Sequence, residues 1–122
     1  MNEGLGPEKR LKKRKDFEKI FLEGEVAKSE WFVARYLKND LKFPRIGIVV
    51  SRKFGKAHVR NKFKRYVRET FRKMHFERNI DVVIFPTKEL KKEFENITYE
   101  DFSEALRLFF EKIASQNEKV KL

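Results

Sequence analysis

Residues 52–72 read RKFGKAHVRNKFKRYVRETFR, and this stretch says most about the chain. Nine of its 21 residues are Lys or Arg, and only Glu69 is acidic. At about 100° of rotation per residue, its apolar side chains fall on one stripe of a helix. The stripe comprises Val59, Phe63, Tyr66, Val67, Thr70, Phe71 and Met74. The spacing predicts a helix that begins at Val59, ends near His75 or Phe76, and packs one side against a core.

The polar side of this predicted helix is strongly cationic. Its basic arc spans about 140° and comprises Arg60, Asn61, Lys64, Arg65, Arg68 and Arg72. Lys62, Glu69 and Lys73 occupy a third edge. A solvated surface helix usually mixes acidic and basic residues that pair with one another. One acid among so many bases therefore favours a nucleic-acid partner over a plain solvated face.

The composition points the same way. The chain has 122 residues, a net charge of +11 and a pI near 9.9, which suits one domain that binds nucleic acid or another anionic surface. With 40% hydrophobic residues and thirteen Phe, it should fold. The absence of Cys excludes a disulfide framework, a thiolate metal site and a Cys nucleophile.

The N-terminus does not resemble a signal peptide. Residues 1–15 lack the apolar core of a signal peptide, and no run approaches the length of a membrane span. We therefore expect a cytoplasmic protein with no membrane partner. We expect a flexible N-terminus at 1–8, a single RNA-binding domain at 9–116 and a tail at 117–122. Six bases in residues 9–15 fit either a solvated segment or extra phosphate contacts.

Two further helices and a short helical segment are expected outside the basic stretch. Asp16 can cap or open a helix that carries Phe17 and Phe21 on one face and ends at Gly24. Thr87 is a candidate cap for a short segment at 88–94. A last helix should begin at Thr98, with acids in its first turn, where the helix dipole favours them. Its expected buried stripe is Phe102, Ala105, Leu106, Phe109 and Ile113.

Three apolar runs predict strands, at residues 29–38, 45–51 and 80–85. Asn39 and Asp40 supply a turn between the first two, which are expected to pair as an antiparallel hairpin. The strand at 45–51 is expected to be central, and Pro86 to end the strand at 80–85.

Enzyme motifs are weak. His58 and His75 have no Cys or acid at metal-ligand spacing, and no Gly-rich phosphate loop precedes a Lys-Ser or Lys-Thr pair. No Ser-His-acid arrangement can be picked out, and a pair of catalytic carboxylates is left open. We therefore assign no catalytic residue and no metal ligand to the chain.

Three segments together resemble the protein subunit of bacterial ribonuclease P. They cover roughly residues 10–113, in the same order and at similar spacings as in that family. The segments are Leu11-Lys12-Lys13-x-x-Asp16-Phe17-x-x-Ile20-Phe21-x-x-Gly24, the run from Gly47 through Ser51 to Ala57, and Arg60-Asn61-Lys62-x-Lys64-Arg65-x-x-Arg68-Glu69.

The resemblance implies an α/β (α+β) two-layer sandwich, in which helices pack on a central mixed sheet, as in the second domain of a small-subunit ribosomal protein. It also implies that the crossover from the strand at Ile46 through the basic helix to the strand at Ile80 is left-handed. The general rule for parallel strands would predict a right-handed crossover.

The resemblance further implies two RNA contacts. The basic helix and its lead-in loop would bind the catalytic RNA subunit, which cleaves with Mg²⁺, while the first helix and the sheet would bind the 5′ leader of precursor tRNA. The implied RNA-subunit set is Arg52, Lys53, Lys56, Arg60, Asn61, Lys62, Lys64, Arg65 and Arg68. The implied leader set is Phe17, Phe21, Arg35 and Tyr36.

Two positions depart from the family pattern. Arg35 stands where relatives often have an aromatic residue, and it could stack on a base or contact phosphate. Lys62 stands where the signature has its second Arg. The positive charge is kept, but the planar guanidinium that can bind two phosphate oxygens at once is lost.

Three other functions remain open from sequence alone. A ribosomal or ribosome-assembly protein could use the same basic face, and a protein-only nuclease could cleave RNA with magnesium. A DNA-binding protein is a weaker candidate and is not expected, because no second helix lies a short turn before the basic helix, as a helix-turn-helix requires.

Overall fold

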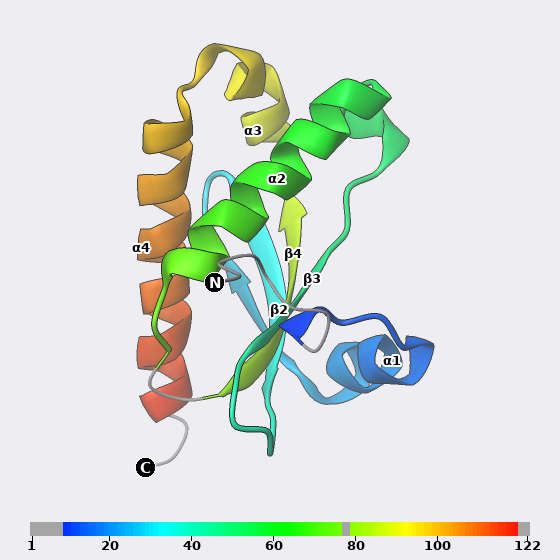
Figure 1. Ribbon diagram of the computed structural model, residues 1–122, viewed down its shortest axis with the longest axis vertical. Coiled ribbons are helices and arrows are strands. Elements are labelled where there is room, and N and C mark those ends of the chain that lie inside the picture. Colours follow the sequence, from blue (N-terminus) through cyan, green and yellow to red (C-terminus); the bar gives the residue numbers. More distant parts are fainter. Residues whose placement is uncertain (1–8, 77–78, 120–122) are drawn as a thin grey trace, which may run out of the picture.

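The computed structural model describes residues 9–76 and 79–119, which form a four-stranded mixed sheet with helices on both faces (Figure 1). The strands are β1 (Glu25–Lys28), β2 (Phe32–Lys38), β3 (Arg45–Ile48) and β4 (Ile80–Pro86), in the spatial order β1-β2-β4-β3. β2 pairs antiparallel with both β1 and β4, whereas β3 pairs parallel with β4. The α+β class predicted from the sequence is confirmed.

The strand order corrects two expectations. β2 and β3 do not form a hairpin, because β4 lies between them. β3 is not central either: in the sheet order it is the last strand. The physical reason is burial, since residues 80–84 are buried on both faces of the sheet and such a strand belongs in the middle. β1 was not predicted, and it pairs with β2.

The free side of β3 is partly covered by the N-terminal segment. Arg10 forms a parallel bridge with Ile46, and the backbone N–H of Leu11 donates to the Ile46 carbonyl at 2.9 Å. The contact satisfies part of a strand edge that would otherwise be open. It also brings the basic residues near Arg10 into the folded domain.

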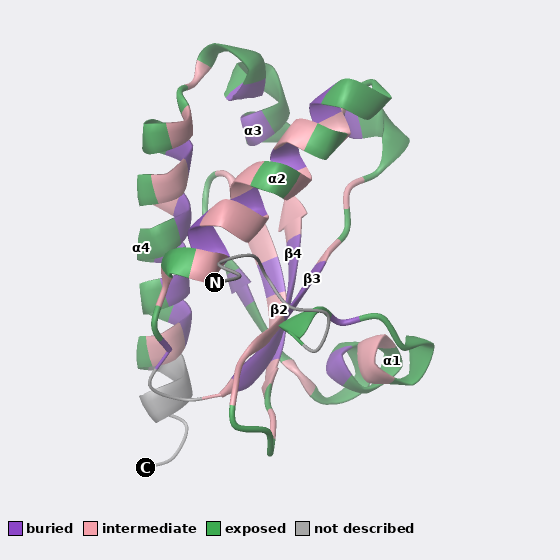
Figure 2. Cartoon of the chain, viewed as in Figure 1, coloured by how far each residue is buried: buried purple, intermediate pink, exposed green. Residues whose placement is uncertain are grey.

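The main core lies between the sheet and two helices, α2 (Ala57–Lys73) and α4 (Tyr99–Lys119) (Figures 1 and 2). Alternate residues of β2 and β4 point into it, among them Phe32 and Ile84. The ring of Phe102 packs edge-on against Phe32 and Phe63, with ring centroids 5.3 and 5.8 Å away. The apolar stripe predicted for α4 is confirmed, although Ala105 is only partly buried.

Two threonines cap helices, and Thr87 does so as predicted. The Thr98 hydroxyl accepts from the backbone N–H of Asp101 at 3.1 Å, just before α4. The Thr87 hydroxyl accepts from Leu90 N–H at 3.2 Å and caps α3 (Lys88–Glu93), which continues into the 3-10 turn η3 (Phe94–Asn96).

A smaller apolar cluster lies on the opposite face of the sheet, under α1 (Arg14–Glu23). It consists of Leu11, Ile20 and Val83, flanked by partly buried Phe17, Leu37 and Phe85. Gly24 ends α1 as predicted, but Asp16 lies inside the first turn and the N-cap is Lys13, which makes no side-chain capping bond.

β3, α2 and β4 form a parallel βαβ unit, entered through the 3-10 turn η2 (Arg52–Phe54). The left hand of this crossover stays a prediction. α4 continues to Lys119 and so includes the start of the tail expected at 117–122, while the N-terminus expected to be flexible, 1–8, lies outside the described residues. None of the helices within residues 9–76 and 79–119 is long and apolar enough to cross a membrane.

Candidate nucleic-acid interface

The basic arc of α2 faces away from the core. The buried residues of the helix are Val59, Phe63, Val67, Thr70 and Phe71, which fix its rotation against the sheet and α4. Asn61 and Arg65 are exposed, while Arg60, Lys64 and Arg68 are half-buried, so their long stems lie along the helix surface. The core contacts therefore present these charged groups together on one rigid element.

The loop before α2 presents three more cations. The side chain of Phe54 is buried, with ring centroids 5.4 Å from Phe63 and 5.3 Å from Phe94, and this anchors η2. The neighbouring Arg52, Lys53 and Lys56 are exposed. A hydrogen bond also joins this loop to α2: Arg60 Nε donates to the Gly55 carbonyl at 3.1 Å.

Lys62 lies at the edge of the predicted RNA-subunit set, and it shares the Tyr66 ring with Arg65. Its ammonium group sits 5.5 Å from the ring centroid of Tyr66 and 5.3 Å from that of Phe94, on the flank of α2 that faces α3 and η3. The basic arc lies on the next side of the helix. Lys62 stabilises this aromatic flank through cation–π contacts, which is a structural role whether or not it also contacts RNA.

Arg10 of the N-terminal segment lies near enough to Arg68 of α2 for their charges to interact. Partial burial lowers the pKa of Arg68 from its usual value, and the positive charge of Arg10 lowers it further. Two guanidinium groups that repel each other are stabilised when an anion lies between them. The pair therefore extends the basic surface from α2 toward β3, and the basic run near residue 10 contributes to it.

A second surface lies between α1 and the sheet. Phe21 is 40% exposed, and its ring centroid lies 6.1 Å from that of Phe85 on β4. Arg35 of β2 places its guanidinium 5.3 Å from the Phe21 ring centroid and donates through Nη1 to the Phe21 carbonyl at 2.5 Å. Phe17 is half-buried over Gly47. Phe17, Phe21 and Arg35 are thus brought together, with planar groups suited to stacking on bases.

Tyr36 does not belong to this surface. Its side chain is only 3% exposed and lies in the main core, on the other face of the sheet. Burial raises the pKa of its hydroxyl, and the nearby charge of Glu25 adds to the effect. Successive residues of a strand point to opposite faces, so Arg35 and Tyr36 cannot both face α1. The assignment of Tyr36 to the leader-binding set was wrong.

The structure adds a pocket that the sequence did not indicate. It has a volume of about 630 Å³ and lies where β3 and β4 end, between η2 and α3. Phe54, Phe85 and Pro86 give it an apolar lining. Among the described residues, four lysines line it and no carboxylate does; they are Lys53, Lys88, Lys91 and Lys92.

The place of this pocket follows a general rule, since ligands of sheets with parallel strands often bind beyond the carboxyl ends of those strands. Sequence reasoning passed over Lys88, Lys91 and Lys92 because the C-terminal third of the chain is nearly neutral. The parallel pairing of β3 with β4 is the signal that would have found them.

No metal centre can be assigned to the part of the chain that the structure describes, because nowhere in it do three His, Asp or Glu side chains gather closely enough to hold an ion. His58 and His75 are both exposed.

The basic helix, the exposed aromatic groups beside Arg35 and the mixed sheet define a class of small, strongly basic α+β proteins. Within that class, the family described as Ribonuclease P matches residues 5–114 of the chain. The ribonuclease P protein component of Thermotoga petrophila is 48% identical over 101 residues, covering 81% of this chain and 86% of the relative. The chain belongs to the family of bacterial ribonuclease P protein subunits, which confirms the resemblance found in its sequence.

Solved structures agree with this assignment. The RNase P protein of Thermotoga maritima superimposes with a TM-score of 0.75 at 45% identity, over 82% of this chain and 94% of that one. The RNase P protein of Staphylococcus aureus gives a TM-score of 0.76 at 30% identity, over 86% of this chain and 94% of the other.

Proposed function

We propose that this chain is the RNA-binding protein subunit of a ribonuclease P, and that it promotes removal of the 5′ leader from precursor tRNA in the cytoplasm. The observation that carries the proposal is the basic arc of α2, held outward by a helix whose other side is locked in the core. In this role the arc and the η2 loop bind the catalytic RNA subunit. Each phosphate neutralised releases counterions, so this affinity falls steeply with salt.

The surface between α1 and the sheet is the proposed site for the leader. Phe17, Phe21 and Arg35 offer stacking and charge without reading particular bases, which suits a leader whose sequence varies between precursors. Phe85 contacts Phe21 and also lines the lysine pocket, so the stacking surface and the pocket share this residue. A single strand that leaves the stacking surface can place its phosphates against Lys88 and Lys53.

In this proposal the protein itself breaks no bond. The RNA subunit with Mg²⁺ hydrolyses the phosphodiester, and the protein raises affinity for precursor over mature tRNA. Lys and Arg near the RNA also neutralise part of the phosphate charge that magnesium ions would otherwise neutralise, so cleavage needs less magnesium.

The deciding experiment is single-turnover cleavage of a precursor tRNA by bacterial ribonuclease P RNA at limiting magnesium, with and without the chain. We expect strong stimulation by the chain and no cleavage by the chain alone. Unchanged kinetics would overturn the proposal, and binding to ribosomal subunits would then be tested. Cleavage by the highly purified chain, lost on replacing one acid, would instead support a protein-only nuclease.

A further inference from the structure

α1 is weakly fixed to the sheet by apolar contacts. Ile20 is the one buried residue of its ten, and the apolar cluster beneath it is small. A helix of this length is marginal by itself in water, and the N-cap of α1 makes no side-chain bond. Polar contacts at its ends must therefore contribute to where it lies. At the C-terminal end, that contact is the bond from Arg35 to the Phe21 carbonyl.

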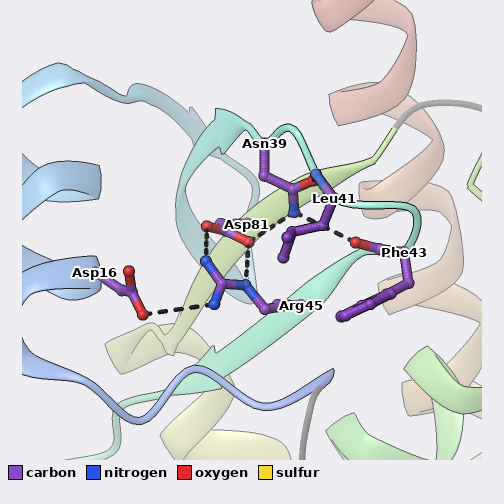
Figure 3. A network of polar contacts seen from close by, with 6 residues as sticks. All are labelled: Asp16, Asn39, Leu41, Phe43, Arg45 and Asp81. Carbon is purple, nitrogen blue, oxygen red and sulfur yellow. Dashed lines mark hydrogen bonds and ion pairs between the residues drawn. The ribbon is translucent and has the colours of Figure 1, made fainter.

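At the other end of α1, the contact is a charged network on the same face of the sheet (Figure 3). Arg45 Nε and Nη2 donate to the two carboxylate oxygens of Asp81, at 2.8 and 2.7 Å. Arg45 and Asp81 are opposite each other in the β3–β4 register. Asp81 is 6% exposed and also accepts from Asn39 Nδ2 at 2.8 Å. The hydrogen bond to Asp81 raises the pKa of Arg45, so the guanidinium stays charged.

The third nitrogen of this fixed guanidinium faces α1. Arg45 Nη1 lies 3.5 Å from Asp16 Oδ2, and both side chains are about four-fifths shielded from solvent. The next residue, Phe17, packs its ring on Gly47, which is two positions after Arg45 and faces the same side of β3. Asp16 and Phe17 thus contact successive same-face positions of one strand. An ion pair at the first position sets the helix register that puts the Phe17 ring at the second.

We propose that Asp16 is a positioning residue for the leader site: its ion pair with Arg45 holds the first turn of α1 so that Phe17 and Phe21 face the leader together. The inference rests on the proposed function. Asp16 does not contact RNA in this role. It acts through Arg45, which Asp81 keeps from moving away.

The test compares two variants of α1 in the assembled holoenzyme. Asp16→Asn removes the charge and keeps the shape. Glu18→Gln is the matched control, because it removes the same charge from the same helix at an ion pair of the same length, Arg14–Glu18, which is solvent-exposed. Each variant is assayed with a precursor whose leader reaches the protein and with one whose leader is too short to do so.

For Asp16→Asn we expect cleavage efficiency on the long-leader precursor to fall about two- to fivefold, as the loss of a partly shielded ion pair allows. Efficiency on the short-leader precursor and affinity for the RNA subunit should stay unchanged. Asp16→Glu should recover part of the loss. Arg45→Lys should share the defect, since an ammonium cannot hold both carboxylates in a planar fork.

Equal losses on both precursors would show a merely structural role and overturn the proposal, and so would an unchanged Asp16→Asn variant. An equal loss in Glu18→Gln would mean that the change in net charge alone explains the effect, and this would also overturn the proposal. If Asp16→Asn fails to fold, as judged by circular dichroism, Arg45→Lys decides by the same leader-length comparison. A wild-type chain that does not stimulate cleavage would instead refute the proposed function.

Discussion

Arg65 has the position of an RNA-contacting cation rather than of a structural one. It is exposed on α2, and its guanidinium lies 5.6 Å from the ring centroid of Tyr66, which limits its freedom without neutralising its charge. Arg60 is different, because its bond to the Gly55 carbonyl also holds the η2 loop. Replacing Arg60 would therefore change structure and charge together, and Arg65 is the cleaner test.

We predict that Arg65→Ala weakens binding to ribonuclease P RNA and lowers the slope of log K against log salt by about one. The measurement is a salt titration of RNA affinity. Arg107→Ala, on the exposed side of α4, removes the same charge and should leave the slope close to that of the wild type. Equal slopes in the two variants would mean that only net charge matters.

Phe21 should act on the substrate and not on stability. Its side chain is 40% exposed, so Phe21→Ala loses little core packing. We predict a loss of precursor over mature tRNA discrimination of about 1–3 kcal/mol, the value of one base stacked on an aromatic ring. The measurement is the ratio of the two tRNA affinities in the holoenzyme. Leu22→Ala is the control, since Leu22 is 85% exposed on the same helix. A large drop in melting temperature would contradict this role.

Among single residues, those on the helix were placed on the predicted side, whereas of the two on β2 Arg35 lies beside Phe21 as predicted and Tyr36 does not. The helical period alone put Arg65 on the exposed side and Phe63 on the buried side, because residues spaced three or four apart share one face of a helix. Tyr36 was misplaced because the family pattern was followed without the two-residue alternation of a strand. Lys88 could not be found from local sequence, since its role depends on where β3 ends in space.

At the scale of elements, the approach of α1 to β3 depends on Gly47. A Cβ added there would lie 2.9 Å from two ring carbons of Phe17, which is closer than such atoms normally approach. We predict that Gly47→Ala pushes Phe17 and α1 outward and costs about 1–3 kcal/mol of folding free energy, as overpacking does. Chemical denaturation measures the cost, and the precursor preference should fall with it.

A control for Gly47→Ala is Ala105→Gly on α4, far from the leader site in the fold (Figure 1). It should cost about 1 kcal/mol through helix propensity and leave the precursor preference unchanged. If the precursor preference fell equally in both variants, instability rather than the position of α1 would explain it.

Elements were predicted better than their pairing. The helices were found because period and caps are local, as with Thr98 and Thr87. β1 was missed because three of its four residues are exposed and it gains its order from β2. The β2–β3 hairpin was expected because the two runs are neighbours in sequence. β4, which is buried over residues 80–84, inserts between them, and this gain in burial depends on the pairing of the whole sheet.

At the scale of the whole molecule, the sheet separates the two proposed binding surfaces. α2 covers one face and carries the basic arc, while α1 covers part of the other with Phe17 and Phe21 (Figure 1). The buried strand β4 contributes to both cores, through Ile84 on one side and Val83 on the other. In the proposed function, this arrangement lets one small domain hold the catalytic RNA through α2 and the leader beside α1 at once, and of the residues named for these contacts only Lys53 serves both.

This separation predicts additivity. In the double variant Arg65→Ala/Phe21→Ala, the losses of free energy for precursor cleavage should sum to those of the single variants within about 0.5 kcal/mol, as expected for distant, independent sites. The measurement is a double-mutant cycle on single-turnover efficiency at fixed salt. Phe21→Ala/Arg35→Ala is the positive control, because these side chains are in contact and should show coupling. Strong coupling between Arg65 and Phe21 would mean that the RNA subunit and the leader share one continuous surface, and the division of the molecule into two faces would then be wrong.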